Sequence, residues 1–473
     1  MGILAVLTAT TDLGLYFRGY FVGDADEVIR AWYGRCAIEN PSIIPYSHLS
    51  QPGWTALLAV GEGLARLLGL PLTLMGRLTT VLFSWWCLRS VARFITVAGG
   101  SWRMAVAAQG LLICAPGYFL LSLSVYPSIA LAAVTAASLT ALAQGKTTRA
   151  AGLIAWAPLL RWEGILLVAL VGLFVLIRRS WRPVPWLVGP YLVWIAAQAL
   201  RYGNPWKPLA YRTSKAMGAW LLFNPSVGWD RMEPALHNLV ALWSPVVLVG
   251  GLFVGLFALF QGRNRLGRDT LAPVALGFGG LTIALLSIQH DWMVWALRVF
   301  GTPMVLGVMC IGGVAARVKR GGILLAVATV GVMISGGMAF NKLNSATIPP
   351  AGGFHVEVGF HMFVRPAQAD DALAWLHEQE ADWVISNHLN ANLLRADETC
   401  SLYDLPLRLG SPRMSLSRDF VPVFGLPEGE GLVVFHTKAA GVEDCKKVAE
   451  FRDSRLLVYR CGQRSGEGAT RTP

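Results

Sequence analysis

Three carboxylates stand within four positions of a chain that is otherwise poor in acids. Asp24, Asp26 and Glu27 form the stretch GDADE, which follows an apolar run over residues 2–17. A carboxylate at the edge of lipid is costly unless it has a partner or a function. The acids could charge the first turn of a helix that starts near Val28. Alternatively, one Asp could act as a general base while the other positions a substrate or a metal ion.

Other polar residues that could do chemistry lie in short loops between apolar segments. In chain order they are His48; Arg161 and Glu163 in RWEG; Arg201, Tyr202, Lys207, Arg212 and Lys215; and His290, Asp291 and Arg298. The basic and aromatic loop around 201–215 suits the phosphate of a lipid-linked substrate, although interfacial anchoring explains the same composition. For the RWEG loop, a buried ion pair between Arg161 and Glu163 is as good an explanation as a catalytic role. His290 and Asp291 could be a pair at the end of a helix, or could contact the phosphate or a metal.

The composition indicates a membrane protein with many crossings. Of 473 residues, 54% are hydrophobic and only 14% are charged, with a mean hydropathy of +0.51, which is too apolar for a soluble protein of this size. The net charge of +12 need not indicate nucleic-acid binding, because excess Lys and Arg in a membrane protein usually mark its cytoplasmic loops. The chain lacks a nucleotide-binding or zinc-binding motif, so we expect no nucleic-acid partner and no soluble nucleotide donor.

We expect about 11 transmembrane helices, with residues 2–17 as a first span rather than a cleavable signal peptide. The further candidate spans are 74–88, 104–121, 124–143, 151–160 with 165–177, 184–200, 237–260, 271–289, 299–316 and 321–339. Five basic clusters lie between them, at 89–103, 146–149, 178–182, 263–268 and 317–320. If all five are cytoplasmic, the positive-inside rule holds throughout. The segment 54–70 is then interfacial or re-entrant, and the acidic loop 18–53 faces the outside.

The long apolar runs of the sequence end near residue 340. We expect residues 341–464 to form a small extracytoplasmic α/β domain, followed by a disordered tail at 465–473. DDALAWLHEQEADWVISN predicts a helix followed by a strand, GLVVFHTK and SRLLVYRC predict further strands, and GVEDCKKVAEF between them predicts a helix. A disulfide among Cys400, Cys445 and Cys461 would fit an oxidising outer compartment, but the sequence does not assign the pair.

The order of these motifs resembles the GT-C superfamily of membrane glycosyltransferases, of the protein O-mannosyltransferase and aminoarabinose transferase type. The similarity runs from GDADE through the His48 segment and GWTALLAVGEGLARLLGL to APGYFLLSLSVYPSIALA, LLRWEG, RYGNPWKPLAY and WALRVFGTP, within residues 1–340. The resemblance implies a catalytic transmembrane domain over 1–340 that uses a polyprenyl-phosphate sugar donor. It also implies a multi-pass protein of a bacterial inner or plasma membrane, with its active site facing the periplasm or exterior.

By the same resemblance, the acceptor would be a hydroxyl group of a lipid, glycan or protein, and transfer would invert the anomeric centre. Asp26 matches the family's acidic pair most closely and is our first candidate for the base, with Asp24 second and Glu27 beside them. Arg201, Lys207, Arg212, Lys215 and Arg298 would bind the donor phosphate. Some relatives hold a divalent cation, Mg²⁺ or Mn²⁺, on the acidic motif, and Asp24 and Asp26 would be its ligands here. A transporter or flippase of lipid-linked sugars is the alternative.

Overall fold

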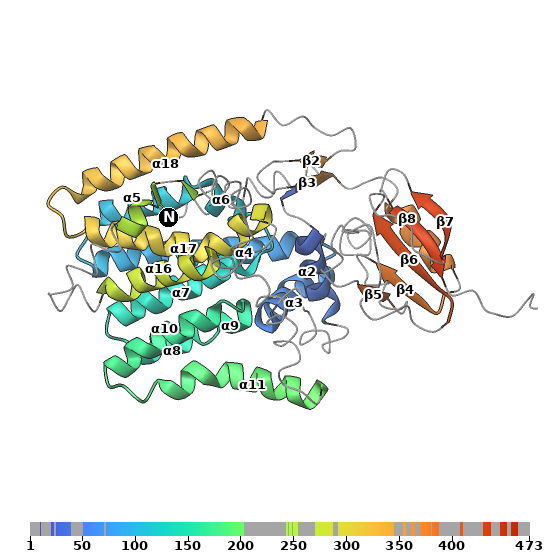
Figure 1. The fold of residues 1–473 in the computed structure, drawn as a ribbon, viewed down its shortest axis with the longest axis horizontal. Helices are drawn as coiled ribbons and strands as arrows, with labels where there is room; N and C mark the ends of the chain where they lie inside the picture. Colours follow the sequence, from blue (N-terminus) through green and yellow to red (C-terminus); the bar gives the residue numbers. More distant parts are fainter. Residues whose placement is uncertain are drawn as a thin grey trace, which may run out of the picture.

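The computed structural model consists of a helical bundle and two β-sheets (Figure 1). The structure describes residues 10, 20–22, 25–38, 51–70, 72–202, 270–286, 292–344 and short segments between 243 and 253. In the C-terminal part it describes residues 353–355, 361–364, 369–379, 381–386, 407–409, 429–436, 445–451 and 456–461. The predicted spans at 2–17 and 237–260 lie largely outside these ranges, as does the tail at 465–473.

Eleven of the described helices build the bundle. They are α4 (Leu74–Val97), α5 (Trp102–Ile113), α6 (Pro116–Ser122), α7 (Pro127–Ala143), α8 (Thr147–Ile154), α9 (Ala157–Leu160), α10 (Gly164–Ile177), α11 (Val184–Tyr202), α16 (Ala272–Leu286), α17 (Trp292–Ala315) and α18 (Gly321–Asn344). The predicted span 104–121 is broken into α5 and α6, which meet at an 80° bend. Pro116 explains the break, since proline lacks an N–H donor and disfavours helical geometry at Ala115 before it.

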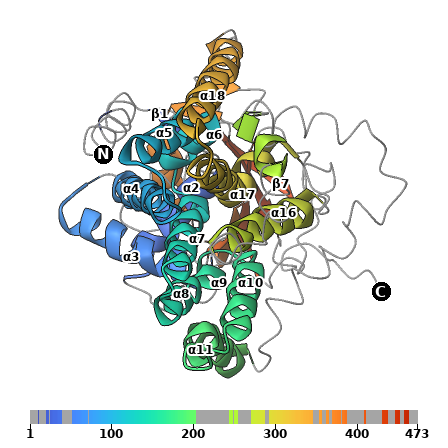
Figure 2. The same ribbon diagram turned by 90° about the vertical axis from the view of Figure 1, so that its left-hand side faces the viewer.

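The core of the bundle is a single apolar cluster that joins α4, α5, α7, α10, α16 and α17. Figure 2 looks along the helices and shows α7 surrounded by its neighbours. Almost every residue of α7 is buried, which agrees with a sequence that is apolar on all sides of the helix.

By length and apolar composition, none of the helices in the described ranges qualifies alone as a membrane-spanning segment. The bent pair of α5 and α6 qualifies when the two are taken together. Shorter apolar helices are found at Pro127–Ala143, Gly164–Ile177, Val184–Ala197, Ala272–Leu285, Phe300–Ala315 and Gly321–Ser335.

The bundle has two chemically different ends (Figure 1). At one end, called the arginine end, lie the turns after α4, α7, α10 and α17, which carry four of the five basic clusters. At the other, called the α2 end, lie α2 (Ala25–Cys36) and α3 (Pro52–Leu67), next to the β-sheets. The helix α3, which covers most of the segment 54–70, packs beside α2 rather than within the long helices of the bundle.

A three-stranded antiparallel sheet joins the N-terminal part of the chain to the part after residue 350. Strand β1 (Tyr20–Val22) pairs with β3 (His361–Val364), and β3 pairs in turn with β2 (Gly353–His355). The strand directly before the acidic motif is therefore held at the edge of a sheet whose other strands come from the C-terminal part.

The second sheet has five strands in the order β5-β4-β6-β8-β7. They are β4 (Trp383–Ser386), β5 (Leu407–Leu409), β6 (Gly431–His436), β7 (Lys446–Phe451) and β8 (Leu456–Cys461), with α19 (Ala369–Glu378) packed on them. The predicted helix and strand over 370–387 and the strands at 431–436 and 456–461 are confirmed. One hydrophobic cluster contains Trp32 of α2 together with Leu376 and Val434 of this unit.

The prediction of a helix in GVEDCKKVAEF is wrong, because Lys446–Phe451 is the edge strand β7. This strand forms an antiparallel hairpin with β8, and a disulfide joins Cys445 to Cys461 across it. Cross-strand pairing and the disulfide outweigh the helical pattern of a short charged segment. The lysines on an exposed edge also hinder pairing with other chains. A disulfide, which the sequence left open, is thus present between two of the three candidate cysteines.

Candidate functional site

The acidic motif connects β1 to α2. Strand β1 ends at Val22, which is in register with Met362, and α2 begins at Ala25. The helix therefore starts three residues earlier than expected, so that Asp26 and Glu27 belong to its first turn. A carboxylate in a first turn interacts favourably with the helix dipole. The sheet pairing on one side and the helix on the other fix the direction in which the chain enters the motif.

Glu27 anchors this first turn to α4. Its Oε1 accepts a hydrogen bond from Nε of Arg77 over 3.2 Å, and both side chains are completely buried. A buried carboxylate and guanidinium compensate each other, whereas either alone would be strongly unfavourable. The geometry gives Glu27, which we predicted beside the catalytic acids, a buried contact that fixes the first turn of α2 against α4.

A second buried ion pair fixes the far end of α2. Arg35 donates from Nη2 to Glu62 of α3 over 3.3 Å and to the carbonyl oxygen of Leu70 over 2.8 Å. The other carboxylate oxygen of Glu62 accepts the N–H of Gly76 over 2.8 Å. Burial raises the pKa of Glu62 from 4.5 to about 7, opposed by the charge of Arg35 and by hydrogen bonds that favour the carboxylate. The two pairs tie α2 to α3 and α4.

The RWEG loop belongs to the same region. Arg161 forms an ion pair with Glu163 and donates from Nη1 to Ser128 of α7 over 3.1 Å. Glu163 is almost fully buried, and its Oε2 has no hydrogen-bond partner among the residues that the structure describes. The buried pair predicted as one alternative is confirmed, and it fastens the α9–α10 turn to the start of α7. The guanidinium of Arg30 lies over the ring of Tyr126, just before α7, 4.9 Å from its centroid.

The remaining predicted site residues fall into two groups. Outside the described ranges lie Asp24, His48, Lys207, Arg212, Lys215, His290 and Asp291. For four others the structure places the backbone alone: Asp26 in α2, Arg201 and Tyr202 at the end of α11, and Arg298 in α17. The end of α11 and the start of α17 both lie at the α2 end of the bundle (Figure 1), where the resemblance requires their basic loops.

Sequence reasoning missed the partners that support the motif. Arg77 lies in the first turn of α4 within a helix read as a membrane span, and Arg35 and Glu62 were not assigned to any pair. The signal that could have found them is a charged residue inside an otherwise apolar helix, since such residues are rarely buried without a partner. Their spacing along the chain, 27 and 50 residues, carries no information about which charges meet.

Within the described part of the chain, no three His, Cys, Asp or Glu side chains lie close enough to hold a metal ion. Asp24 lies outside that part. The proposed cation on Asp24 and Asp26 therefore stays a prediction.

Comparisons with known proteins give the fold. No protein-family model matches the chain, and no curated protein matches its sequence. ArnT from Cupriavidus metallidurans bound to undecaprenyl phosphate has a similar structure, with a TM-score of 0.56, 13% identity, and coverage of 97% of this chain and 99% of that one. The arabinofuranosyltransferase AftD from Mycobacteria gives a TM-score of 0.50 and 16% identity over 99% of this chain and 42% of AftD. The GT-C fold predicted from the motif order is confirmed.

Proposed function

We propose that this chain is a multi-pass membrane glycosyltransferase that moves a sugar from a polyprenyl-phosphate donor to a hydroxyl acceptor with inversion. The observation that carries the proposal is the match along almost the whole chain to ArnT, which was crystallised with undecaprenyl phosphate. The acidic motif adds support, because it lies at the start of a helix that two buried ion pairs hold in place.

In the proposed reaction, Asp26 accepts the proton of the acceptor hydroxyl as the oxygen attacks the anomeric carbon. The bond between that carbon and the phosphate oxygen breaks, and the polyprenyl phosphate leaves with the electron pair. Asp24 is the second candidate for the base. Asp26 must be held within hydrogen-bond reach of the acceptor, and the adjacent pair of Glu27 and Arg77 supplies that rigidity.

The leaving phosphate requires positive charge. We propose that Arg201, Lys207, Arg212, Lys215 and Arg298 supply it and that Tyr202, His48, His290 and Asp291 contact the substrate. Arg161 is engaged by Glu163 and Ser128, so its role in the proposal is to position α7 and α10.

The proposed placement has the arginine end in the cytoplasm and the α2 end on the outer side, as the positive-inside rule requires. In a bacterial inner membrane the site would face the periplasm. The disulfide between Cys445 and Cys461 supports this orientation, since disulfides persist in oxidising compartments.

The test is transfer of labelled sugar from a polyprenyl-phosphate donor by purified protein carrying Asp26→Asn or Asp24→Asn. Loss of the base should lower the rate by about 10²–10⁴-fold in one of the two variants. Asp371→Asn is the matched control, because Asp371 is an exposed acid in the first turn of α19, and its activity should be unchanged. Full activity in both Asp26→Asn and Asp24→Asn would refute the assigned role.

Two further measurements test the transporter alternative and the proposed divalent cation. A transporter or flippase would move labelled donor across the membrane of liposomes without forming product. A divalent cation on the acidic motif would make transfer sensitive to a chelator and restorable by Mg²⁺ or Mn²⁺.

A further inference from the structure

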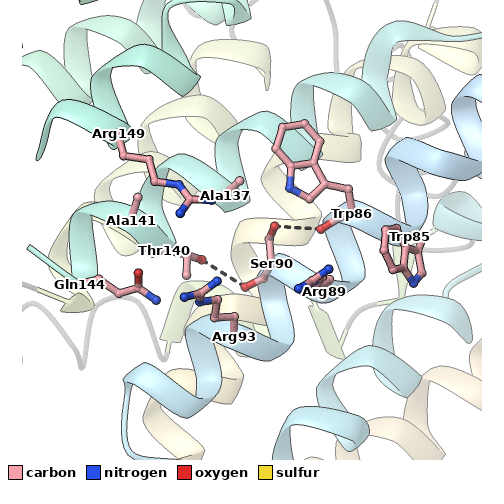
Figure 3. Close-up of a pocket in the computed structure, with 10 residues that line it drawn as sticks. All are labelled: Trp85, Trp86, Arg89, Ser90, Arg93, Ala137, Thr140, Ala141, Gln144 and Arg149. Atoms are coloured by element: carbon pink, nitrogen blue, oxygen red, sulfur yellow. Dashed lines mark hydrogen bonds between the residues drawn. The ribbon is translucent and has the colours of Figure 1, made fainter. Parts of the chain in front are cut away.

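The arginine end of the bundle contains a cavity that the proposed reaction does not use. Its volume is about 230 Å³, and it opens between α4, α7 and α8 (Figure 3). The residues that line it are Trp85, Trp86, Arg89, Ser90, Arg93, Ala137, Thr140, Ala141, Gln144 and Arg149. Three guanidinium groups therefore surround one space, far along α4 from the pair of Glu27 and Arg77.

The helical spacing explains how the cavity forms. On α4, Trp85, Arg89 and Arg93 recur every four residues and so share one face. On α7, the small side chains of Ala137 and Ala141 leave room opposite that face. Figure 3 shows Arg93 from α4 and Arg149 from α8 extending toward the same space beside Thr140.

The charge of the cavity is uncompensated in the part of the chain that the structure describes. Its lining contains three arginines and no acid. Arg89 lies over the ring of Trp85, 5.7 Å from the centroid, which orients the guanidinium but does not neutralise it. Like charges that line one cavity repel each other, so an anion in the cavity would be favoured.

The hydroxyl groups that line the cavity donate hydrogen bonds to backbone carbonyl oxygens. Ser90 donates to the carbonyl oxygen of Trp86 over 2.8 Å, and Thr140 donates to the carbonyl oxygens of Ser90 and Ala136 over 3.1 and 2.7 Å. The lining still offers a ligand the three guanidinium groups, the amide of Gln144 and the indole N–H groups of Trp85 and Trp86. Guanidinium groups bind phosphate oxygens in a bidentate fashion.

The surface next to the cavity is apolar. Leu82 is 65% exposed and Trp85 is 37% exposed, and both precede the arginines on α4. An acyl chain could lie along Leu82 while the phosphate enters between the arginines, with Trp85 at the boundary as aromatic residues are in membranes. A free phosphate would gain nothing from this apolar surface.

We propose that this cavity binds the phosphate of an anionic phospholipid from the leaflet at the arginine end. The inference rests on the membrane placement given under the proposed function. Basic pockets between helices on the cytoplasmic side are suited to such headgroups. The proposed lipid site is separate from the proposed donor site, because the described elements that carry donor-site residues, the end of α11 and the start of α17, lie at the α2 end (Figure 1).

The test measures lipid retention by native mass spectrometry on the purified full-length protein in detergent. The probes are phosphatidylglycerol, phosphatidylcholine with the same acyl chains, and inorganic phosphate. Wild-type protein should retain phosphatidylglycerol in preference to phosphatidylcholine. The variant R89Q/R93Q/R149Q should lose about tenfold or more of that affinity, since it lacks three charge-assisted contacts. The control R103Q/R182Q removes two exposed arginines of the same end outside the cavity and should bind as wild type.

A second variant distinguishes loss of the binding site from misfolding of the triple variant. Ala137→Leu fills the cavity without changing any charge, and it should also weaken phosphatidylglycerol binding. Equal retention of phosphatidylglycerol by wild type and the triple variant would overturn the proposal. Binding of inorganic phosphate with no retention of lipid would overturn it in favour of a soluble phosphate ligand. Asp26→Asn should keep the lipid while losing transfer, so failure of the lipid site and failure of the proposed reaction give different results.

Discussion

At the α2 end of the bundle, Arg35 and Arg77 are buried, and each lies within 3.3 Å of a carboxylate oxygen. At the arginine end, Arg89, Arg93 and Arg149 are exposed and line an open cavity without any acid. The same residue type is therefore used for rigidity at one end and for an accessible positive charge at the other. The comparison separates arginines that hold the proposed catalytic turn from arginines available to a ligand.

Helix α4 carries both kinds of arginine. Arg77 lies in its first turn and Arg93 near its last. Because the two arginines share one helix, substituting each of them compares a buried position with an exposed one in the same helix. The α2 end also receives strand pairing from β3 and apolar contacts from the C-terminal unit, whereas the cavity at the arginine end is built from α4, α7 and α8.

Arg77→Gln should have the largest effect on stability. It leaves Glu27 buried without its counter-charge, which costs about 3–5 kcal/mol. The matched change Arg93→Gln on the same helix should shift stability by only about 0.5 kcal/mol, as exposed substitutions do. Thermal unfolding of the two purified variants against wild type measures the difference.

A rescue sharpens this prediction. The double variant E27Q/R77Q removes both charges and should recover part of the stability lost in Arg77→Gln, because the buried carboxylate no longer lacks a partner. Equal losses for Arg77→Gln and Arg93→Gln would show that the two ends do not differ in the way the burial indicates. A double variant no better than Arg77→Gln alone would assign the loss to packing of the long side chain instead.

The sequence was sufficient for the parts of the fold that depend on local patterns. Apolar runs predicted most of the bundle helices, since burial or lipid contact requires long apolar segments whatever their partners. The basic clusters predicted that the turns after α4, α7, α10 and α17 share one end, and Figure 1 shows that they do. Motif order predicted the fold through resemblance.

What the sequence did not predict depends on contacts between distant segments. Nothing near Glu27 indicates Arg77, and nothing near Tyr20 indicates that β1 pairs with β3 more than 300 residues later. The strand β7 was read as a helix because its pairing with β8 is not visible in the short segment itself. The sequence does not indicate the cavity around Arg93, because the positive-inside rule alone accounts for its arginines.

Glu62 should give the stability of the α2 end a dependence on pH. Its pKa rises from 4.5 to about 7 on folding, so the folded state holds a proton that the unfolded state releases between these values. Its contribution to stability is therefore complete below pH 4.5, declines as pH rises to 7, and is constant above. The linkage corresponds to roughly 3 kcal/mol at most.

Unfolding temperature measured from pH 4 to pH 8 tests this dependence. The variant Glu62→Gln keeps an oxygen for the N–H of Gly76 and should remove the decline between pH 4.5 and 7. Glu378→Gln, at an exposed position of α19, is the control and should preserve the wild-type profile. A decline of unchanged size in Glu62→Gln would assign it to another group.

The smallest effect is expected from adding one methyl group, by a Gly→Ala substitution, to a helix at each end of the bundle. A Cβ at Gly34 in α2 would lie 2.6 Å from Cβ and 2.9 Å from the carbonyl carbon of Leu58 in α3. Gly34→Ala must therefore push α2 and α3 apart and should cost about 1–3 kcal/mol. A Cβ at Gly152 in α8, on the helix that carries Arg149, would meet nothing within 4 Å.

Gly152→Ala should therefore raise stability by about 0.5–1 kcal/mol through helix propensity alone. The opposite signs can be read from unfolding temperatures of the two variants. Because Gly34 lies on the helix that begins with the acidic motif, Gly34→Ala should also lower transfer activity, while Gly152→Ala should not. A stable Gly34→Ala variant with full activity would show that close packing of α2 on α3 is not needed to hold Asp26 in place.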